Sequence, residues 1–234
     1  MLESNSAWLI NLPHAGGSTT LFKRWNKKIL CNILNIEYPG HWTRMEEPLI
    51  DTFDKLAEDV LSIINDMIPK QSVVYLFGHS IGAIMSWYIS PILTQQGYNV
   101  KGLFLSASQN PGAFPEQAIL QSNTDRDMLR LIEYKTAEHD EVINAQFMRT
   151  FLPILKNDIQ VCKSFISDGH YVDVDSIVLY GDEDKFTDVK EMKKWEKYVR
   201  LVSMQEYHGT HLYLEDKENI EKITTFIDGI INKS

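Results

Sequence analysis

The segment Val73–Ala83 constrains the fold of this chain more than any other. It begins with the apolar run Val73–Phe77, continues with Gly-His-Ser-Ile-Gly at positions 78–82, and leads into a stretch with helical spacing of apolar residues. When Gly-x-Ser-x-Gly joins a strand to a helix, it predicts a sharp turn that strains the serine backbone, and the glycines remove Cβ atoms that would clash there. The pattern therefore predicts that Ser80 projects from the end of a strand as a nucleophile. A turn without chemistry is the alternative.

Short apolar runs alternate with longer segments of helical period along most of the chain. This alternation is typical of strands joined by crossover helices, so the predicted class is α/β, with a mostly parallel central sheet flanked by helices. The predicted strands are Trp8–Leu12, Ile33–Tyr38, Val73–Phe77, Gly102–Ser106, Ser176–Tyr180 and Arg200–Met204. The predicted helices are Thr20–Ile29, Phe53–Met67, Ile81–Gln95, Val189–Tyr198 and Lys217–Ile231. We expect a single domain, residues 1–234.

The segment from about Pro111 to Gly169 departs from this alternation. It contains no convincing strand and several amphipathic turns, so we expect a helical insertion, about residues 111–169, between the fourth and fifth strands. An insertion at this place can cover a site at the carboxyl ends of the strands, although an apolar helical stripe is more often core than binding wall. The apolar residues of these turns are Met128, Leu131, Ile132, Val142, Ile143, Phe147, Phe151, Ile154 and Leu155.

Composition argues against several classes of protein. The formal net charge of −9, with no Lys/Arg cluster beyond short pairs, argues against binding to nucleic acid. Cys31 and Cys162 are too few for a disulfide framework and lie in apolar stretches, which indicates a reducing compartment. The start of the chain lacks the pattern of a secretory signal, and no stretch approaches the ~18 apolar residues of a membrane span. We therefore expect a cytoplasmic protein outside the membrane and, since no exposed heptad pattern predicts a dimer, a monomer.

A serine nucleophile needs a base to remove its proton and a carboxylate to orient that base, and in this kind of fold the three follow in the order Ser, acid, His. The turn Gly181–Lys185 follows the fifth strand, and we choose its Asp184 over Asp182, for which a turn-capping role is expected. A solvated acidic turn is the alternative. His208 and His211 both follow the last strand, and position alone leaves the choice of base open.

Acyl transfer also requires two N–H donors for the developing oxyanion. The backbone N–H of Ile81, directly after the nucleophile, is expected to be the first donor. The loop Leu12–Ser18 contains adjacent glycines that let its backbone approach a ligand closely, and the N–H of Ala15 is our candidate for the second donor. A phosphate-binding loop is not supported, because no Lys-Ser/Thr follows the glycines, and the two C-terminal histidines lack the further ligands of a metal site. We expect no cofactor and no metal.

With these residues assembled, the chain resembles the type II thioesterases, the stand-alone editing enzymes that accompany nonribosomal peptide and polyketide synthases. The resemblance spans nearly the whole chain and implies an α/β-hydrolase fold in which the helical insertion is a lid. It selects His211 as the base, because Gly209–Leu214 resembles the family's Gly-Gly-His-Phe-x-Leu segment. The other matching segments are Pro13–Gly17, Tyr38–Gly40 followed by Arg44, Gly78–Ala83, and Gly181 with Asp184.

The chain departs from the family's pattern at two places. Where the family has Pro-Gly-Arg-Gly, residues 39–42 read Pro-Gly-His-Trp, and Thr210 replaces the second glycine before the base. Neither change lies in the Ser80, Asp184 and His211 triad. The first change means that no role of the family's arginine beside Gly40 can be carried over to this chain.

The resemblance implies hydrolysis of acyl groups carried on the phosphopantetheine arm of an acyl or peptidyl carrier protein. In this hypothesis Ser80 attacks the thioester, His211 oriented by Asp184 takes its proton, and the N–H groups of Ile81 and Ala15 hold the oxyanion. The residues alone leave two alternatives open. One is a general carboxylesterase or acyltransferase with the same triad, and the other is a catalytically inactive hydrolase fold that serves as a binding module.

Overall fold

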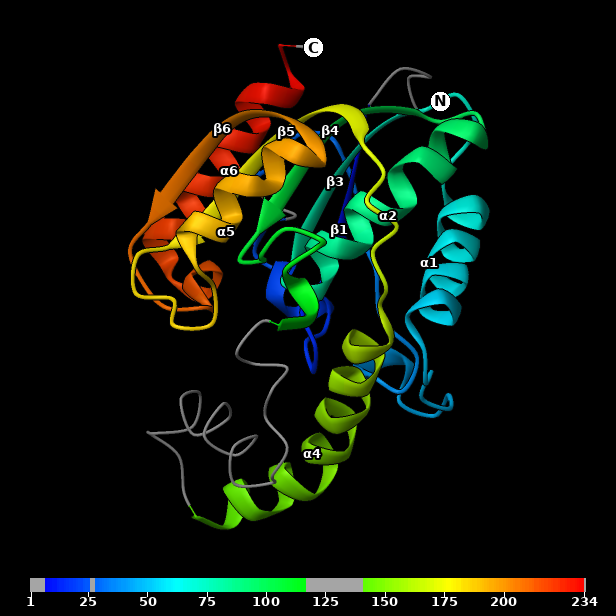
Figure 1. Cartoon of the computed structure of the whole chain (residues 1–234). Coiled ribbons are helices and arrows are strands. Elements are labelled where there is room, and N and C mark those ends of the chain that lie inside the picture. The colour runs from blue at the N-terminus through cyan, green and yellow to red at the C-terminus, as the bar shows by residue number, and fades with distance from the viewer. Residues whose placement is uncertain (1–6, 26–27, 117–140, 234) are drawn as a thin grey trace.

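The computed structural model describes residues 7–25, 28–116 and 141–233 (Figure 1). Within these ranges, six strands form one parallel sheet in the order β2-β1-β3-β4-β5-β6. The strands are β1 (Trp8–Leu12), β2 (Asn32–Asn35), β3 (Val73–His79), β4 (Asn99–Ser106), β5 (Val172–Gly181) and β6 (Val199–Tyr207). The helices are α1 (Phe53–Met67), α2 (Ile81–Gln95), α4 (Glu141–Ser164), α5 (Val189–Lys193) and α6 (Lys217–Ile231). The short 3-10 turns are η1 (Thr19–Phe22), η3 (Trp42–Arg44), η4 (Phe114–Glu116), η6 (Lys194–Lys197) and η7 (Tyr213–Glu215). The predicted α/β class is confirmed.

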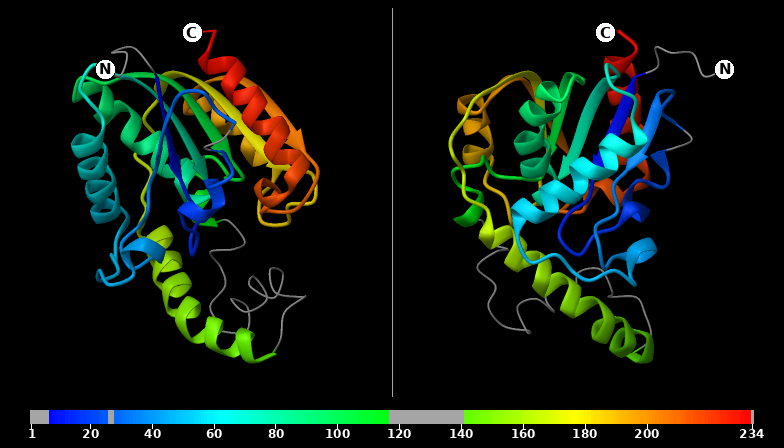
Figure 2. Two further views of the ribbon diagram at one scale, coloured as in Figure 1. Left: turned by 180° about the vertical axis from the view of Figure 1, so that it is seen from behind. Right: turned by 90° about the vertical axis from the view of Figure 1, so that its right-hand side faces the viewer.

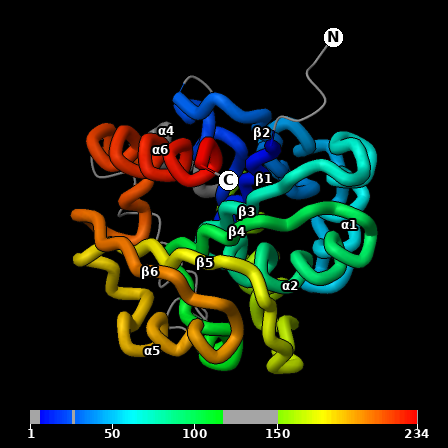
Figure 3. The backbone as a smooth tube through the Cα atoms, turned by 90° about the horizontal axis from the view of Figure 1, so that it is seen from above, coloured from blue at the N-terminus to red at the C-terminus, as the bar shows by residue number. Residues whose placement is uncertain are grey.

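Helices cover both faces of the sheet, and the strand residues divide between the two cores by strict alternation. In β3, Leu76 packs in the core that α1 and α2 cover, whereas its neighbour Phe77 packs in the core that α6 covers. Figure 3 shows α6 on one side of the sheet and α1 and α2 on the other. Since successive side chains of a strand point to opposite faces, a sheet buried on both sides needs the continuous apolar runs seen in the sequence.

The order of the strands places a crevice at the ends of β1 and β3. The chain passes from β1 outward to β2 and then returns across β1 to β3, so the two connections lie on opposite faces of the sheet. Phe22 of the first connection lies in the core under α6, and Leu56 of the second lies in the opposite core. At the carboxyl ends, the chain leaves β1 through η1 on the α6 side of the sheet and leaves β3 through α2 on the other side. Connections that diverge in this way leave room between them, which is where ligands bind in open α/β sheets.

The prediction of a helix over Thr20–Ile29 is wrong. Among the described residues, Thr19–Phe22 form the 3-10 turn η1, Lys23 and Arg24 lie in a turn, and Trp25 again has 3-10 geometry, so the described residues form no α-helix there. The apolar residues spaced like an α-helix are buried in these short 3-10 segments instead: Phe22 and Trp25 pack edge to face on each other and on Phe77 of β3. Burial alone therefore produced the helical period.

Two other predicted elements are shorter than expected. Strand β2 ends at Asn35, because its neighbour β1 ends one residue beyond the partner Asn11 and offers no backbone for Tyr38 to pair with. The helix predicted over Val189–Tyr198 divides into α5 and the tighter turn η6. The side chain of Trp195 in η6 is buried and donates a hydrogen bond to the Ser108 carbonyl at 3.0 Å, which holds this turn against the loop after β4.

The described part of the predicted insertion is helical and free of strands. It consists of η4 and the long helix α4, and residues 117–140, with the turn around Met128 and Leu131, lie outside the described residues. Figures 1 and 2 show α4 extending past the carboxyl ends of the strands. The second half of α4 is fastened to the core: Asn157 donates to the Ile50 carbonyl at 2.7 Å, and Ser164 accepts from the Phe53 N–H at 2.8 Å. No described helix combines the length and the apolar character that a membrane span requires.

Candidate active site

The turn between β3 and α2 holds Ser80 in the strained backbone conformation that the motif predicts. Ser80 has a φ of 58° and a ψ of −117°, which a residue with a Cβ atom rarely adopts. The turn is also tightly packed, because a Cβ atom on Gly78 would lie 1.9 Å from the Gly82 carbonyl oxygen. The Ser80 N–H donates to the Ser106 carbonyl of β4 at 2.8 Å. These contacts fix the serine at the carboxyl end of the sheet.

Asp184 and His211 form a buried pair at the same edge of the sheet. Nδ1 of His211 lies 2.8 Å from Oδ2 of Asp184, and the two side chains are 7% and 1% exposed. Because a carboxylate oxygen accepts, Nδ1 carries the hydrogen in this bond. Nε2 of His211 is buried and has no hydrogen-bond partner among the described residues. The imidazole thus keeps one nitrogen available for proton transfer.

Three further groups hold the Asp184 carboxylate in place, and sequence reasoning missed them. The Phe186 N–H and the Thr187 hydroxyl each donate to Asp184 at 2.8 Å, and the ring of Phe186 stands edge-on to His211. Burial by itself raises the pKa of Asp184, but the hydrogen bond and charge of His211, together with these two donors, outweigh it and hold the pKa below its usual value. The spacing of an aspartate and a threonine three residues later was a signal for such a turn.

The rival pair, Asp182 and His208, lies on the surface. His208 Nδ1 is 3.2 Å from Asp182, and the two side chains are 80% and 40% exposed. Asp182 also accepts the Gly209 N–H at 2.8 Å, so it links the loop after β5 to the loop after β6. This is a structural role, as expected from the sequence. A base for acyl transfer works best where water is excluded, and burial therefore separates the two histidines that position alone did not.

A chain of polar side chains lies beside the nucleophile turn. The ring of His79, the residue before Ser80, lies 5.1 Å from the ring of His211. His79 is hydrogen-bonded to Ser106 at 2.8 Å, and Ser106 to the Tyr213 hydroxyl at 2.6 Å. The Ser80 hydroxyl makes no hydrogen bond to His211 within the described residues. Such bonds are often formed only when substrate is bound.

The two predicted oxyanion donors lie in the segments that follow the serine and β1. Ile81 is the first residue of α2, where free N–H groups and the positive end of the helix dipole favour negative charge. Ala15 lies in the loop after β1, which is pressed against α2 because a Cβ atom on Gly82 would meet the Leu12 carbonyl oxygen at 2.3 Å. Neither N–H donates to another described residue. The next N–H in the loop, that of Gly16, donates to Asp158 of α4 at 2.6 Å.

Asp158 belongs to a second buried pair that sequence reasoning did not find. Its Oδ2 lies 2.9 Å from Nε2 of His41, and the His41 and Asp158 side chains are 4% and 10% exposed. The signal was a carboxylate inside an apolar helical stripe, since Leu155, Ile159 and Cys162 around it are buried. His41 stands where the sequence departs from the family's Pro-Gly-Arg-Gly. A buried basic side chain therefore follows Gly40 in this chain after all.

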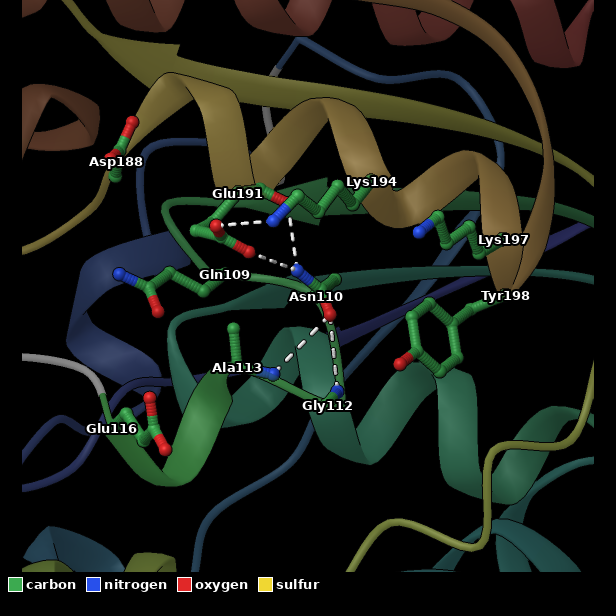
Figure 4. A pocket seen from close by; sticks show the side chains of 10 residues that line it. All are labelled: Gln109, Asn110, Gly112, Ala113, Glu116, Asp188, Glu191, Lys194, Lys197 and Tyr198. Atoms are coloured by element: carbon green, nitrogen blue, oxygen red, sulfur yellow. Dashed lines mark hydrogen bonds and ion pairs between the residues drawn. The ribbon is translucent and has the colours of Figure 1, made fainter.

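Two hollows lie near this edge of the sheet. One, of about 350 Å³, opens between the glycine loop and α4, and its apolar walls are Leu21, Trp42, Met45, Phe151 and Ile154. The other, of about 530 Å³, is polar and lies between the loop after β4 and α5 (Figure 4). In this second hollow Asn110 donates to Glu191, which also receives a hydrogen bond from Lys194, so the polar groups bind one another across it. Within the described residues, no three His, Cys, Asp or Glu side chains are grouped as metal ligands would be.

Comparison with protein families matches residues 8–231 to the family described as "Thioesterase domain". The chain belongs to the thioesterase family. It is accordingly a thioester hydrolase of the serine hydrolase class, and the resemblance to type II thioesterases is confirmed.

Relatives of this thioesterase include enzymes of natural-product pathways. Thioesterase PikA5 of Streptomyces venezuelae is 27% identical over 215 residues, covering 89% of this chain and 76% of that protein. The probable anguibactin biosynthesis thioesterase AngT of Vibrio anguillarum is 24% identical over 213 residues, covering 88% of this chain and 84% of that protein.

Solved structures of thioesterases share the fold. ClbQ from the colibactin NRPS/PKS pathway superimposes with a TM-score of 0.84 at 21% identity, covering 98% of each chain. YbtT, a type II thioesterase from the yersiniabactin NRPS/PKS pathway, superimposes with a TM-score of 0.80 at 20% identity, covering 98% of this chain and 93% of its own. The predicted α/β-hydrolase fold is confirmed.

Proposed function

We propose that this thioesterase hydrolyses acyl groups from the phosphopantetheine arm of carrier proteins, through an acyl-enzyme on Ser80. The pathway names of its relatives, among them anguibactin biosynthesis and an NRPS/PKS pathway, support a carrier-bound substrate. The observation that carries the residue assignment is the buried Asp184–His211 pair. Nε2 of His211 has no hydrogen-bond partner among the described residues, and the His211 ring lies 5.1 Å from the ring of His79, the residue before Ser80.

In this proposal His211 first accepts a proton from Ser80 and then gives that proton to the leaving group. Nε2 of His211 accepts the proton of the Ser80 hydroxyl as Oγ attacks the thioester carbonyl carbon, and Asp184 stabilises the imidazolium that forms. The tetrahedral intermediate collapses, the C–S bond breaks, and the departing pantetheine sulfur takes the proton from His211. Water, deprotonated by the same nitrogen, then attacks the carbonyl carbon of the ester. The C–O bond to Ser80 breaks, Oγ takes the proton back from His211, and the carboxylic acid leaves.

The N–H groups of Ile81 and Ala15 hold the oxyanion of both tetrahedral intermediates. Each such donor contributes about 10²- to 10³-fold in kcat where it has been removed from other hydrolases. The donors act without rearrangement because α2 and the glycine loop are packed on each other through Gly82 and Leu12. The apolar hollow beside the glycine loop supports the binding of a hydrophobic acyl or pantetheine portion, and α4 is the proposed lid over it.

The test of the nucleophile is the Ser80→Ala variant. Hydrolysis of an acyl-N-acetylcysteamine thioester should fall by at least about 10³-fold, because only the oxyanion donors and binding remain. A fluorophosphonate probe should label the wild-type protein at Ser80 and leave the variant unlabelled. Near wild-type turnover by the variant would remove Ser80 from the mechanism. Absence of label on the wild type would favour an inactive binding module.

The test of the carrier is a comparison of two donors that share one acyl group. We expect kcat/KM for acetyl carrier protein to exceed that for acetyl coenzyme A, since contacts with the carrier surface add binding energy. Equal values would leave a general thioesterase, and transfer of the acyl group to added alcohols in place of water would indicate an acyltransferase. We also place the protein in the cytoplasm, which the free thiols of Cys31 and Cys162 support.

A further inference from the structure

The carboxylate of Asp158 binds the glycine loop directly. Its Oδ2 accepts the Gly16 N–H at 2.6 Å, from the residue that follows the proposed donor Ala15. Gly16 has a φ of +67°, and a Cβ atom there would lie 2.7 Å from the Phe151 ring of α4. The loop backbone is thus held between a hydrogen bond and an aromatic contact, and both come from one helix.

His41 binds the same carboxylate oxygen. Its Nδ1 lies 3.0 Å from the Pro39 carbonyl oxygen, and its Nε2 lies 2.9 Å from Asp158. A carbonyl oxygen only accepts, so Nδ1 carries a hydrogen. The contact between Nε2 and Asp158 is an ion pair when the imidazole is protonated. This ion pair is buried, and both nitrogens of the imidazole are occupied.

The charge of Asp158 acts on the ionisable side chains around it, which are His41, Tyr38 and Cys162. Burial by itself lowers the pKa of His41, but the hydrogen bond and charge of Asp158, the Pro39 carbonyl and the charge of Glu37 outweigh it, so the pKa of His41 is raised. Burial, and next the charge of Asp158, raise the pKa of both Tyr38 and Cys162 well above its usual value, so these two side chains are neutral. The Tyr38 hydroxyl donates to the Pro13 carbonyl, another contact to the glycine loop, at 3.1 Å.

We propose that Asp158 and His41 are positioning residues, which act through the Gly16 N–H to hold the loop carrying the Ala15 N–H in place, so that oxyanion stabilisation depends on this buried pair. The proposal rests on the function proposed above. A donor displaced by about 1 Å can cost about 10²-fold in rate, whereas substrate binding in the ground state is little affected. The pair therefore acts on kcat more than on KM.

The experiment measures kcat and KM for an acyl-N-acetylcysteamine thioester, together with the rate of labelling by a fluorophosphonate, whose phosphoryl oxygen occupies the oxyanion site. We expect Asp158→Asn to lower kcat and the labelling rate by about 30- to 100-fold with KM changed less than about threefold. The matched control is Asn157→Ala, which breaks a hydrogen bond between α4 and the Ile50 carbonyl and leaves Gly16 untouched. Its kcat should stay within about twofold of the wild type.

His41→Gln is the second variant, and it keeps the proposal testable if Asp158→Asn does not fold. It breaks the same pair from the other side and should also lower kcat and the labelling rate. In the double variant, the losses should be less than additive, since both residues act on one loop. Wild-type kcat in a folded Asp158→Asn or His41→Gln protein would overturn the proposal, as would an equal loss in Asn157→Ala. If the wild type itself neither hydrolyses the thioester nor reacts at Ser80, the proposed function fails instead.

Discussion

Two aspartate–histidine pairs are buried in the described part of the chain, near the carboxyl ends of the strands, and they are built differently. In the Asp184–His211 pair the imidazole uses one nitrogen, at 2.8 Å from the carboxylate, and Nε2 has no partner within the described residues. In the Asp158–His41 pair both nitrogens are used, at 2.9 Å to the carboxylate and 3.0 Å to the Pro39 carbonyl. The two pairs have the same composition and similar burial.

The two pairs differ in whether the imidazole has a ring nitrogen without a hydrogen-bond partner in the described structure. A histidine with one occupied and one available nitrogen has a fixed tautomer and can accept a proton at a defined atom. A histidine with both nitrogens occupied can only hold its partners in place. Burial and pairing therefore do not by themselves identify a base, and the count of occupied nitrogens separates the proposed catalytic pair from the positioning pair.

The largest effect should come from Asp184→Asn. An amide can donate to Nδ1 and so favour the tautomer with its hydrogen on Nε2, which cannot accept the Ser80 proton. We expect kcat to fall by about 10⁴-fold with little change in the free energy of unfolding. Steady-state hydrolysis and urea denaturation measure the two quantities. A loss below tenfold would mean that the available nitrogen of His211 is not the base.

The next effect is on stability and belongs to the other pair. Asp158→Ala leaves the buried His41 and the Gly16 N–H without their acceptor, so the free energy of unfolding should fall by about 3 kcal/mol. The double variant His41→Phe with Asp158→Ala should lose less, because no unpaired buried charge remains. Urea denaturation of the three proteins tests this order. A double variant that is less stable than Asp158→Ala would contradict the ion pair.

The pH dependence of stability gives a smaller and more specific signal. The pKa of His41 is raised in the folded state, so its contribution is complete below the unfolded value of about 6.5 and is lost as the pH rises through the folded value. Within that window the stability of the wild type should fall relative to the double variant by up to about 1.4 kcal/mol per pH unit. Denaturation at a series of pH values measures the difference. A difference that grows with pH would reverse the assignment.

The smallest effect is expected at the exposed pair Asp182–His208. His208→Ala removes a solvent-exposed ion pair, and exposed pairs contribute little to stability. The kcat should remain within about twofold of the wild type, because Asp182 still accepts the Gly209 N–H. The same two assays apply. A large loss of kcat would return His208 to the choice of base.

Features set by residues that are neighbours in the sequence could be predicted, whereas features set by contacts between distant residues could not. The turn at Ser80 was predictable because backbone sterics demand glycine at fixed positions around it, and β1, α1, α2 and α6 have the predicted bounds. The choice of His211 over His208 came from family resemblance, since the deciding quantity is burial, which a linear pattern does not contain. The pair formed by His41 and Asp158 joins residues 117 positions apart, and only the apolar stripe around Asp158 hinted at it.

The direct packing of α2 on the end of β1 has a consequence for engineering this enzyme. Because the Leu12 carbonyl oxygen would lie 2.3 Å from a Cβ atom on Gly82, the helix, the strand end and the serine turn form a block that cannot adapt to acyl groups of different size. In the proposed function the neighbouring apolar hollow receives the acyl group, so its lining residues would set selectivity among chain lengths. Redesign of substrate range should begin at Trp42, Met45 and Ile154, and leave the block unchanged.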